Sequence, residues 1–507
     1  MSLKKRIMMN AGANWASIII NAAVLLVLVP IMQRKVGWDG YGTWALLAQG
    51  LAFVSFWDAA FSLAINRFVA FYRDKPQQRN EVVSASFLIL LFMAIISILF
   101  ATGLSFVIAD IFKAIPKHLA GQAQIVCILV GVTLAFRMLE SSFSGSLRGY
   151  EYFVRCNAVT SVFNLLRLIL TIVLLNIWPS IVTLQAAFAV SAGVSALLMY
   201  LVSIRSIPGM KVSYRYLNWR AVKELFSYTV HSVARSGSMI IMLSLMALLV
   251  GWKGTAKDVA IYDIGTRIPM FIRGFVAAIQ NVFLPTITNL CAIGQSGAIR
   301  RIVTKGTQVC AAITCIAAVL LFAFAPDILS TWLHGDVPAG TAAVMQVQII
   351  SMLPTGFFDI WLPTLVGMGF LGGLTFISIL TAVLALVMAI VLLQFTNINV
   401  PMAAVLSVTT ALIIKSGLWL PIYGVRKLGM SMYEYCRDSI FLPTAAAVLS
   451  VVCIYVVNTL ARRANIAWPA AFGGSALLTG LIFTLLVFRS EFASFLGAVE
   501  KILFGKK

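Results

Sequence analysis

Long apolar stretches recur along the whole chain of 507 residues and limit its fold more than any other feature. About fourteen of them reach roughly 20 residues, the length that an α-helix needs to cross a hydrocarbon core about 30 Å thick. Strands of a membrane barrel would be shorter and would alternate between apolar and polar residues. Only 11% of the residues are charged and 61% are hydrophobic, which agrees with this interpretation. The sequence therefore predicts an all-α polytopic membrane protein. The stretches are 11–33, 42–66, 82–108, 122–147, 157–178, 183–204, 225–250, 260–290, 302–325, 341–367, 371–395, 400–424, 438–460 and 467–488.

Basic residues are distributed unevenly between the connections of these predicted helices. Alternate connections hold most of the lysines and arginines, beginning with Lys4, Lys5 and Arg6, whereas the others hold few, such as Lys113 and Lys117. Because cytoplasmic loops are enriched in lysine and arginine, we expect both termini in the cytoplasm and an even number of spans. The same bias accounts for most of the net charge of +21, which therefore indicates topology and not nucleic-acid binding.

A basic and aromatic connection at 205–224 divides the chain into two halves. The pentapeptides VGWDG at 36–40 and VGWKG at 250–254 lie at the outer end of the first predicted helix of each half. Transporters are often built from such repeats, with the substrate site at the interface between them. We expect two six-helix bundles, a linker, and two extra C-terminal helices with a cytoplasmic tail. The corresponding ranges are 1–204 for the first bundle, 205–224 for the linker, 225–425 for the second bundle and 426–507 for the remainder.

Nothing in the pattern predicts an enzyme or a metalloprotein. The longest hydrophilic stretch has about 20 residues, whereas a domain usually needs about 50 or more. The seven cysteines are scattered, and no CxxC motif or cysteine–histidine spacing suggests a metal site or a disulfide. The apolar run after MSLKKR lacks the short core and the cleavage site of a signal peptide, so we expect the first helix to be retained. We expect no cofactor and no catalytic residue.

Seven basic residues lie inside the predicted helices or at their inner ends. A cation at the centre of a bilayer costs roughly 2.5–3.5 kcal/mol on insertion scales, so such groups usually face a polar cavity or a partner. Three of the arginines lie about 10 residues from the inner ends of their helices, roughly 15 Å deep, and a fourth lies slightly deeper. Four guanidinium groups at one level predict a ring that binds an anionic ligand; the alternative is that they form structural ion pairs. This ring comprises Arg137, Arg167, Arg235 and Arg273, and the other three cations are Arg67, Arg267 and Lys415.

The remaining intramembrane charges have two interpretations each. Arg67 and Lys415 could extend their side chains to the membrane surface, although Lys415 is also a candidate for binding the substrate, as is Arg267. The pair Asp263–Arg267, four residues apart, could form a gate or a simple ion pair. Asp359 could bind a coupling cation or pair with an arginine. The acids that we consider for coupling or gating are Asp58, Glu140, Asp263 and Asp359.

Polar residues at helical spacing predict which helices line a cavity. Asn10, Asn14, Ser17 and Asn21 follow one face of the first predicted helix, at steps of four, three and four. Similar stripes occur on the second, fourth, fifth, seventh, eighth and tenth predicted helices, and we expect these seven helices to surround one central cavity. The alternative is that uncharged polar residues only join helices, at about 0.6 kcal/mol per contact.

Several segments resemble a known family of membrane proteins. NAGANWASIIINAAVLLVLVPIMQRKVGWDGYGTW resembles the opening of polysaccharide-export flippases, and WDAAFSLAINRF resembles the motif of their second helix. SGSLRGYEYFVRCN resembles their loop after helix four, and VAIYDIGTRIP with NVFLPTITNL resembles their helix eight. One departure is that Ala59 and Ala60 follow Asp58, where the family has a glycine. The chain thus resembles the Wzx-type lipid-linked oligosaccharide flippases of the multidrug/oligosaccharidyl-lipid/polysaccharide exporter superfamily.

This resemblance implies a function, a location and partners. It implies a flippase for undecaprenyl-pyrophosphate-linked oligosaccharide, such as an O-antigen precursor of lipopolysaccharide, in the bacterial inner membrane. The arginines would bind the pyrophosphate, and the polyprenyl tail could stay in membrane lipid along the predicted helices at 438–460 and 467–488. An inward H⁺ or Na⁺ and polysaccharide assembly proteins are further candidate partners. A lipid II flippase is one alternative; a multidrug or cation exporter is another, but it predicts an acidic cavity, whereas here seven bases outnumber four acids.

Overall fold

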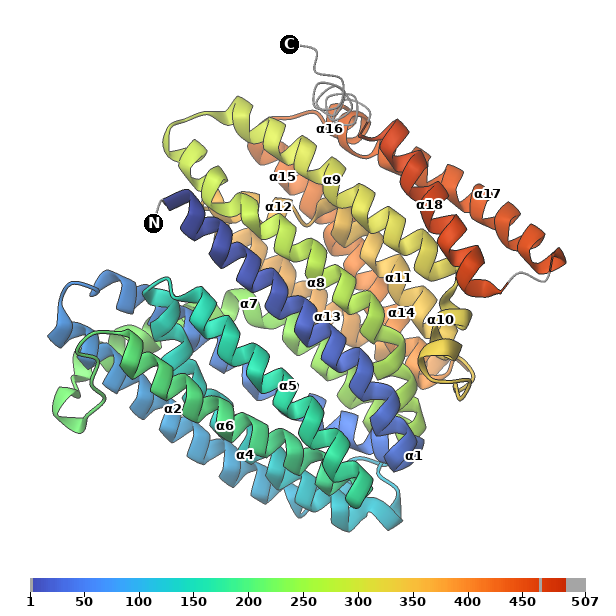
Figure 1. Ribbon diagram of the computed structural model, residues 1–507. Coiled ribbons are helices and arrows are strands. Elements are labelled where there is room, and N and C mark those ends of the chain that lie inside the picture. The colour runs from blue at the N-terminus through green and yellow to red at the C-terminus, as the bar shows by residue number, and fades with distance from the viewer. Residues whose placement is uncertain (1–2, 465–466, 489–507) are drawn as a thin grey trace, which may run out of the picture. The chain divides into compact units, whose positions relative to one another are not determined.

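The computed structural model describes residues 3–464 and 467–488, without the side chains of residues 3–11, 15, 50–59, 230–241, 371 and 462. All regular elements in this part of the chain are helices (Figure 1). Twelve described helices are long and apolar enough to span a membrane, and each overlaps one of the predicted stretches. The all-α multi-pass class is thereby confirmed. The predicted stretches 42–66 and 225–250 each include residues whose side chains are outside the description, so the count of fourteen stays a prediction.

The chain divides into two compact units, Met1–Asp263 and Ile264–Lys507. This division follows packing within the chain: α7 lies against α1 and therefore belongs to the first unit. The predicted ranges came from a sequence repeat, which a division by packing does not test. The ranges 1–204, 205–224, 225–425 and 426–507 therefore stay predictions. The first unit contains α1 (Leu3–Phe71), α2 (Pro76–Ser105), α3 (Ile108–Ile111), η1 (Lys117–Leu119), α4 (Ala120–Gly149), α5 (Phe153–Ile177), α6 (Ile181–Ser206), η2 (Tyr214–Tyr216), α7 (Trp219–Lys253) and the start of α8 (Ala256–Ala292).

Element α1 consists of two helices joined at Gly37. This glycine has φ 72° and ψ 175°, a backbone conformation that is strained for any residue with a Cβ atom. It belongs to the VGWDG pentapeptide, where the sequence predicts the end of the first membrane helix. The second half of α1 then packs closely on α4. A methyl group on Gly145 would lie 2.9 Å from the carbonyl oxygen of Ser62, and one on Gly149 equally close to that of Asn66. Small residues thus allow the two backbones to approach, as is common between membrane helices.

The connection at 205–224 is held on the start of α2. The side-chain amide of Asn80 donates to the carbonyl oxygen of Gly209 at 3.0 Å, and that of Asn218 donates to Glu81 at 2.8 Å. The backbone N–H of Ser213 donates to the Ser84 hydroxyl at 3.2 Å. The linker is therefore an ordered part of the first unit and not an extended spacer.

In the second unit, the described residues up to 488 form the rest of α8 and ten further α-helices, with one π-helical segment. The span Val400–Leu428 is continuous, but its middle turns are π-helical, which leaves a wider turn around Lys415. Single turns of this kind often occur at functional sites. The elements are α9 (Ser296–Ala323), α10 (Ala325–Trp332), α11 (Thr341–Phe358), α12 (Trp361–Gly367), α13 (Leu371–Phe395), α14 (Val400–Leu412), η3 (Ile413–Trp419), α15 (Leu420–Leu428), α16 (Met432–Ser439), α17 (Phe441–Arg463) and α18 (Trp468–Leu486).

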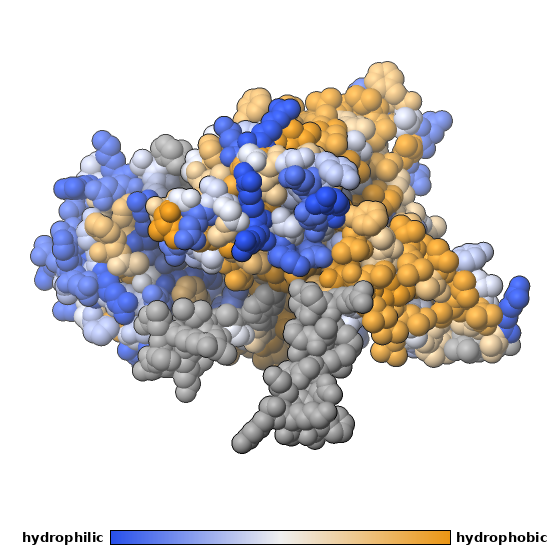
Figure 2. All heavy atoms as spheres, turned by 90° about the horizontal axis from the view of Figure 1, so that it is seen from above, coloured by the Kyte–Doolittle hydropathy of each residue, from blue (hydrophilic) through white to orange (hydrophobic). Residues whose placement is uncertain are grey.

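Large apolar side chains are exposed along the membrane helices. On α2, Phe92, Leu99 and Phe100 are 63%, 66% and 57% exposed. Figure 2 shows extensive hydrophobic areas of this kind beside areas of hydrophilic side chains. Exposed apolar surface on this scale is unusual for a soluble monomer and is what a lipid-facing helix requires.

Candidate functional site

Arg167 lies buried on α5 between groups from three helices. Its Nη2 donates to the side-chain oxygen of Asn21 on α1 at 3.4 Å. The guanidinium carbon lies 5.3 Å from the ring centroid of Phe163 on α5 and 5.1 Å from that of Phe188 on α6. Aromatic faces attract a cation without neutralising it. Asn21 and the two aromatic rings therefore hold the Arg167 side chain in position.

Arg137 on α4 reaches the same aromatic ring. Its guanidinium carbon lies 5.9 Å from the Phe163 centroid, so Phe163 contacts both Arg137 and Arg167. Glu140, one turn along α4, lies within electrostatic reach of Arg137 and Arg148. Arg137, Arg148 and Glu140 thus form one charged group on α4. The first unit thus brings together two of the four arginines of the predicted ring.

A second group of charges lies in the interior of the second unit. Asp359, directly after α11, and Lys415, in the π-helical segment η3, are 8% and 7% exposed. Arg273, near the middle of α8, interacts electrostatically with Asp359, and so does Lys415. Gln280 on α8 donates to the carbonyl oxygen of Thr355 at 3.2 Å, which ties α8 to the last turn of α11. Arg273 and Lys415 thus both interact with the same acid, Asp359.

The geometry bears on two pairs of alternatives left by the sequence, for Lys415 and for Asp359. Lys415 is buried and does not extend to the surface. Asp359 lies in the field of Arg273 and Lys415, as the pairing interpretation requires. Its Oδ1 atom is buried and accepts no hydrogen bond from the described residues. The carboxylate therefore has capacity for another donor or for a cation.

Three other predicted residues are Arg235, Asp58 and Arg67. Arg235 belongs to α7 and Asp58 to α1, but their side chains are outside the described residues, so both assignments stay predictions. Arg67 is exposed, and its guanidinium carbon lies 4.7 Å from the ring centroid of Tyr228. The Arg67 side chain thus contacts an aromatic ring of α7 and is not buried, unlike Arg167.

Asp263 has a partner that the sequence did not predict. The hydroxyl of Tyr41, in the second half of α1, donates to Asp263 Oδ2 on α8 at 2.5 Å, and both residues are buried. Beside this bond, a methyl group on Gly42 would lie 2.5 Å from the carbonyl carbon of Ala256 and closer still to its oxygen. The Tyr41–Asp263 bond and the Gly42–Ala256 approach, which we call the α1–α8 latch, join segments more than 200 residues apart. Arg267 follows Asp263 by one turn and is partly buried.

The segments around the two pentapeptides also meet at this end of the first unit. A methyl group on Gly251 would lie 2.8 Å from Leu46 Cδ2, so the end of α7 packs tightly on α1. The backbone N–H of Ala114 donates to the carbonyl oxygen of Gly251 at 3.1 Å. The glycines of GYG at 40–42 and of VGWKG at 250–254 are the sequence feature that could have indicated these contacts, because close approach of two backbones requires glycine.

Metal-ligating side chains do not cluster within the described ranges 3–464 and 467–488. No group of three or more histidine, cysteine, aspartate or glutamate side chains there could hold a metal ion. The seven cysteines are free thiols.

The sequence and the fold can now be compared with known proteins. Residues 7–291, more than half of the chain, match the family described as polysaccharide biosynthesis protein. The chain belongs to this family. No curated protein matches the chain.

Solved structures with the same fold include a lipid flippase and multidrug transporters. The lipid II flippase MurJ, in an inward closed conformation, has a TM-score of 0.72 and 14% identity, with 96% of this chain and 99% of that chain covered. A MATE family multidrug resistance transporter of the MOP superfamily, in an inward-facing conformation, has a TM-score of 0.63 and 13% identity, with coverage of 80% and 98%. An outward-facing MATE structure has a TM-score of 0.58 and 13% identity, with coverage of 83% and 95%. The chain therefore has the fold of these transport proteins.

Proposed function

We propose that this member of the polysaccharide biosynthesis family is a flippase for undecaprenyl-pyrophosphate-linked oligosaccharide. It moves this lipid from the cytoplasmic to the outer leaflet of the bacterial inner membrane by alternating access through a cationic cavity. An O-antigen precursor of lipopolysaccharide is such a substrate. The observation that carries this proposal is the pair of charge groups inside apolar helices, Arg137 with Arg167 in the first unit and Arg273 with Lys415 in the second.

Both groups suit a pyrophosphate. Each group contains at least two cations, which attract an arriving anion. The planar guanidinium fork binds phosphate oxygens bidentately, which an ammonium group cannot do. An inside-negative potential favours outward movement of an anion by about 2.3 kcal/mol per charge per 100 mV, so a doubly charged head group gains twice that. Coupling to H⁺ or Na⁺ is therefore compatible with the proposal but not required by it.

The acids hold the cations in place between transport cycles. Removing a charge from water into a protein interior costs several kcal/mol unless a partner compensates. Glu140 compensates Arg137 and Arg148, and Asp359 compensates Arg273 and Lys415. When the pyrophosphate binds, these cations gain a second anion. The acids are thus coupling residues in the sense that they set the charge of the empty site.

The α1–α8 latch acts as the outer gate of this cycle. Tyr41 and Asp263 are buried and bonded, and Gly42 touches the backbone of Ala256, so neither contact survives a separation of α1 from α8 by even a few ångströms. The latch is accordingly formed only in states that are closed at this end, and breaking it is part of opening to the outside.

A lipid II flippase is the second candidate, and the MurJ-like fold over 96% of this chain favours it. Transport in vesicles separates the candidates. The purified protein should move a polyprenyl-pyrophosphate-linked oligosaccharide across the bilayer, with lipid II and a cationic drug supplied in parallel. Preferential movement of lipid II would replace our proposal with the second candidate, and movement of the cationic drug alone would refute both.

A further inference from the structure

Three membrane-spanning helices of the second unit form a groove of about 970 Å³. Its walls are apolar side chains such as Val319 and Phe322 on α9, Leu353 and Phe357 on α11, and Val451 on α17. The volume lies at the upper end of the roughly 300–1,000 Å³ that small-molecule sites occupy. A ligand for this groove must therefore be largely apolar.

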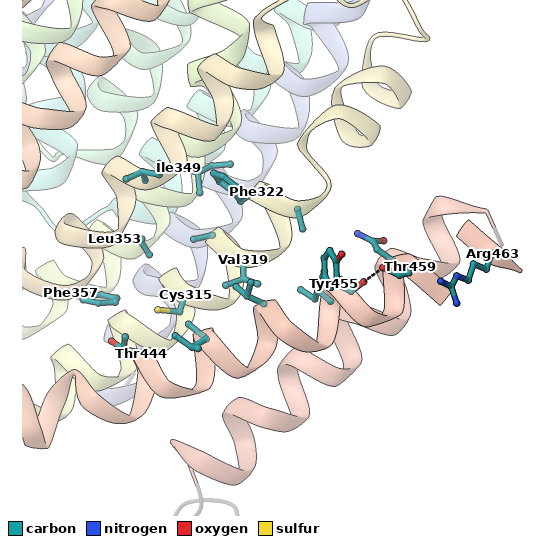
Figure 3. A pocket seen from close by; sticks show the side chains of 18 residues that line it. Cys315, Val319, Phe322, Ile349, Leu353, Phe357, Thr444, Tyr455, Thr459 and Arg463 are labelled. Carbon is teal, nitrogen blue, oxygen red and sulfur yellow. Dashed lines mark hydrogen bonds between the residues drawn. The ribbon is translucent and has the colours of Figure 1, made fainter. Parts of the chain in front are cut away.

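The polar residues of the groove are concentrated at one end. Figure 3 shows Tyr455, Thr459 and Arg463 succeeding one another along α17, away from Phe357 and Thr444 at the opposite end. Arg463 is the one charged residue among the described residues that line the groove. The groove therefore offers an apolar body and a cationic end, which is the polarity of an anionic amphiphile.

The groove extends along most of one membrane helix. On α9 and α11 the lining residues cover eight steps, or about 12 Å, from Cys315 to Ala323 and from Ile349 to Phe357. On α17 they run from Thr444 to Arg463, 19 steps or about 28 Å, which is close to the thickness of a hydrocarbon core of roughly 30 Å. On α17, Val451 and Tyr455 are 53% and 74% exposed, so the groove opens on the side that lipid reaches.

We propose that this groove binds a resident anionic phospholipid, with its acyl chains against α9, α11 and α17 and its phosphate at Arg463. If the proposed function holds, the head group of the transported lipid lies elsewhere, at Arg273 and Lys415 near the middle of their spans, whereas the cation of the groove lies at the end of α17. The polyprenyl tail of that lipid is then the competing occupant, and the displacement measurement below separates the two. The bound phospholipid fills the space between α17 and the two helices behind it and so stabilises their packing.

Lipid retention by the purified protein tests this site. The delipidated protein in detergent is offered phosphatidylglycerol or phosphatidylethanolamine, and bound lipid is counted by native mass spectrometry. Val451→Trp fills the groove, and Val452→Trp is the matched control, because Val452 is equally exposed on α17 but does not line the groove. We expect wild type and Val452→Trp to retain one phosphatidylglycerol and Val451→Trp to retain at least fivefold less.

The charge at the end of the groove is tested separately. Arg463→Gln should reduce the preference for phosphatidylglycerol over phosphatidylethanolamine about fivefold, the effect of one basic residue near a membrane surface. If Val451→Trp does not fold, Arg463→Gln alone tests the proposed lipid site. Equal retention by both tryptophan variants, or an unchanged preference in Arg463→Gln, would overturn the proposal. Displacement of phosphatidylglycerol by an equal concentration of polyprenyl phosphate would overturn it too, because the groove would then belong to the transported lipid.

Discussion

Replacing Gly42 by alanine should open the proposed outer gate. The added methyl group would lie 2.5 Å from the carbonyl carbon of Ala256, whereas ordinary van der Waals contact begins near 3.4 Å. The methyl group would lie closer still to the carbonyl oxygen, and both atoms are backbone, so α1 and α8 must move apart by more than an ångström. Overpacking of this kind costs about 1–3 kcal/mol. This cost applies only to states in which the latch is closed. A bias of about 1–3 kcal/mol changes the ratio of open to closed states about 5- to 150-fold.

Labelling of a cysteine near the latch measures this shift. Ala260 is fully buried on α8, beside the latch. In a background without the seven native cysteines, Ala260→Cys should react with a membrane-impermeant maleimide only when the gate opens. Gly42→Ala should accelerate labelling from outside about 5- to 150-fold. Gly121→Ala is the matched control, because a methyl group there meets no atom within 4 Å. Equal labelling rates in both variants would refute the latch.

Three further predictions concern the charges and the latch. Arg167→Gln should abolish or severely reduce glycan export while the amount of protein in the membrane stays normal, and Arg167→Lys should retain part of the export. Arg67→Ala should reduce export less than Arg167→Ala. Export assays measure the activity, and immunoblots of the membrane fraction measure the amount of protein. Asp359→Asn should lower the thermal midpoint, because losing one member of a buried ionic group costs about 3–5 kcal/mol; an unchanged midpoint would show that Asp359 does not compensate Arg273 and Lys415. Tyr41→Phe should also accelerate labelling of Ala260→Cys, since a hydrogen bond to a charged group contributes about 1.5–3 kcal/mol; a rate equal to wild type would limit the latch to Gly42.

Local sequence patterns predict the membrane helices but not their contacts. The apolar length of each stretch is enough to predict a span, because bilayer thickness fixes that length. The depth of Arg167 follows from its position on α5 in the same way. Its contacts with Phe163 and Phe188 do not, because they depend on how α5 and α6 pack.

Local sequence patterns did not predict two features of the structure, the contacts between distant segments and the irregular turns. Tyr41 and Asp263 are separated by 222 positions, and nothing local to Asp263 indicates a partner other than Arg267. The π-helical turns around Lys415 occur in a stretch whose apolar pattern is that of an ordinary helix. Lys415 lies in these turns and is buried, where the sequence equally suggested a side chain reaching the surface.

Translocation by arginine variants in vesicles tests the central claim most directly. Purified wild type, Arg137→Gln, Arg167→Gln, Arg235→Gln and Arg273→Gln are reconstituted separately with a polyprenyl-pyrophosphate-linked oligosaccharide, with Arg67→Gln as the control for loss of one charge. If the cations bind the head group, each of the four variants should move the lipid far more slowly than wild type, and Arg67→Gln should be closer to wild type. Normal translocation by all four would contradict the account, and these arginines would then be structural partners of Asp58, Glu140 and Asp359.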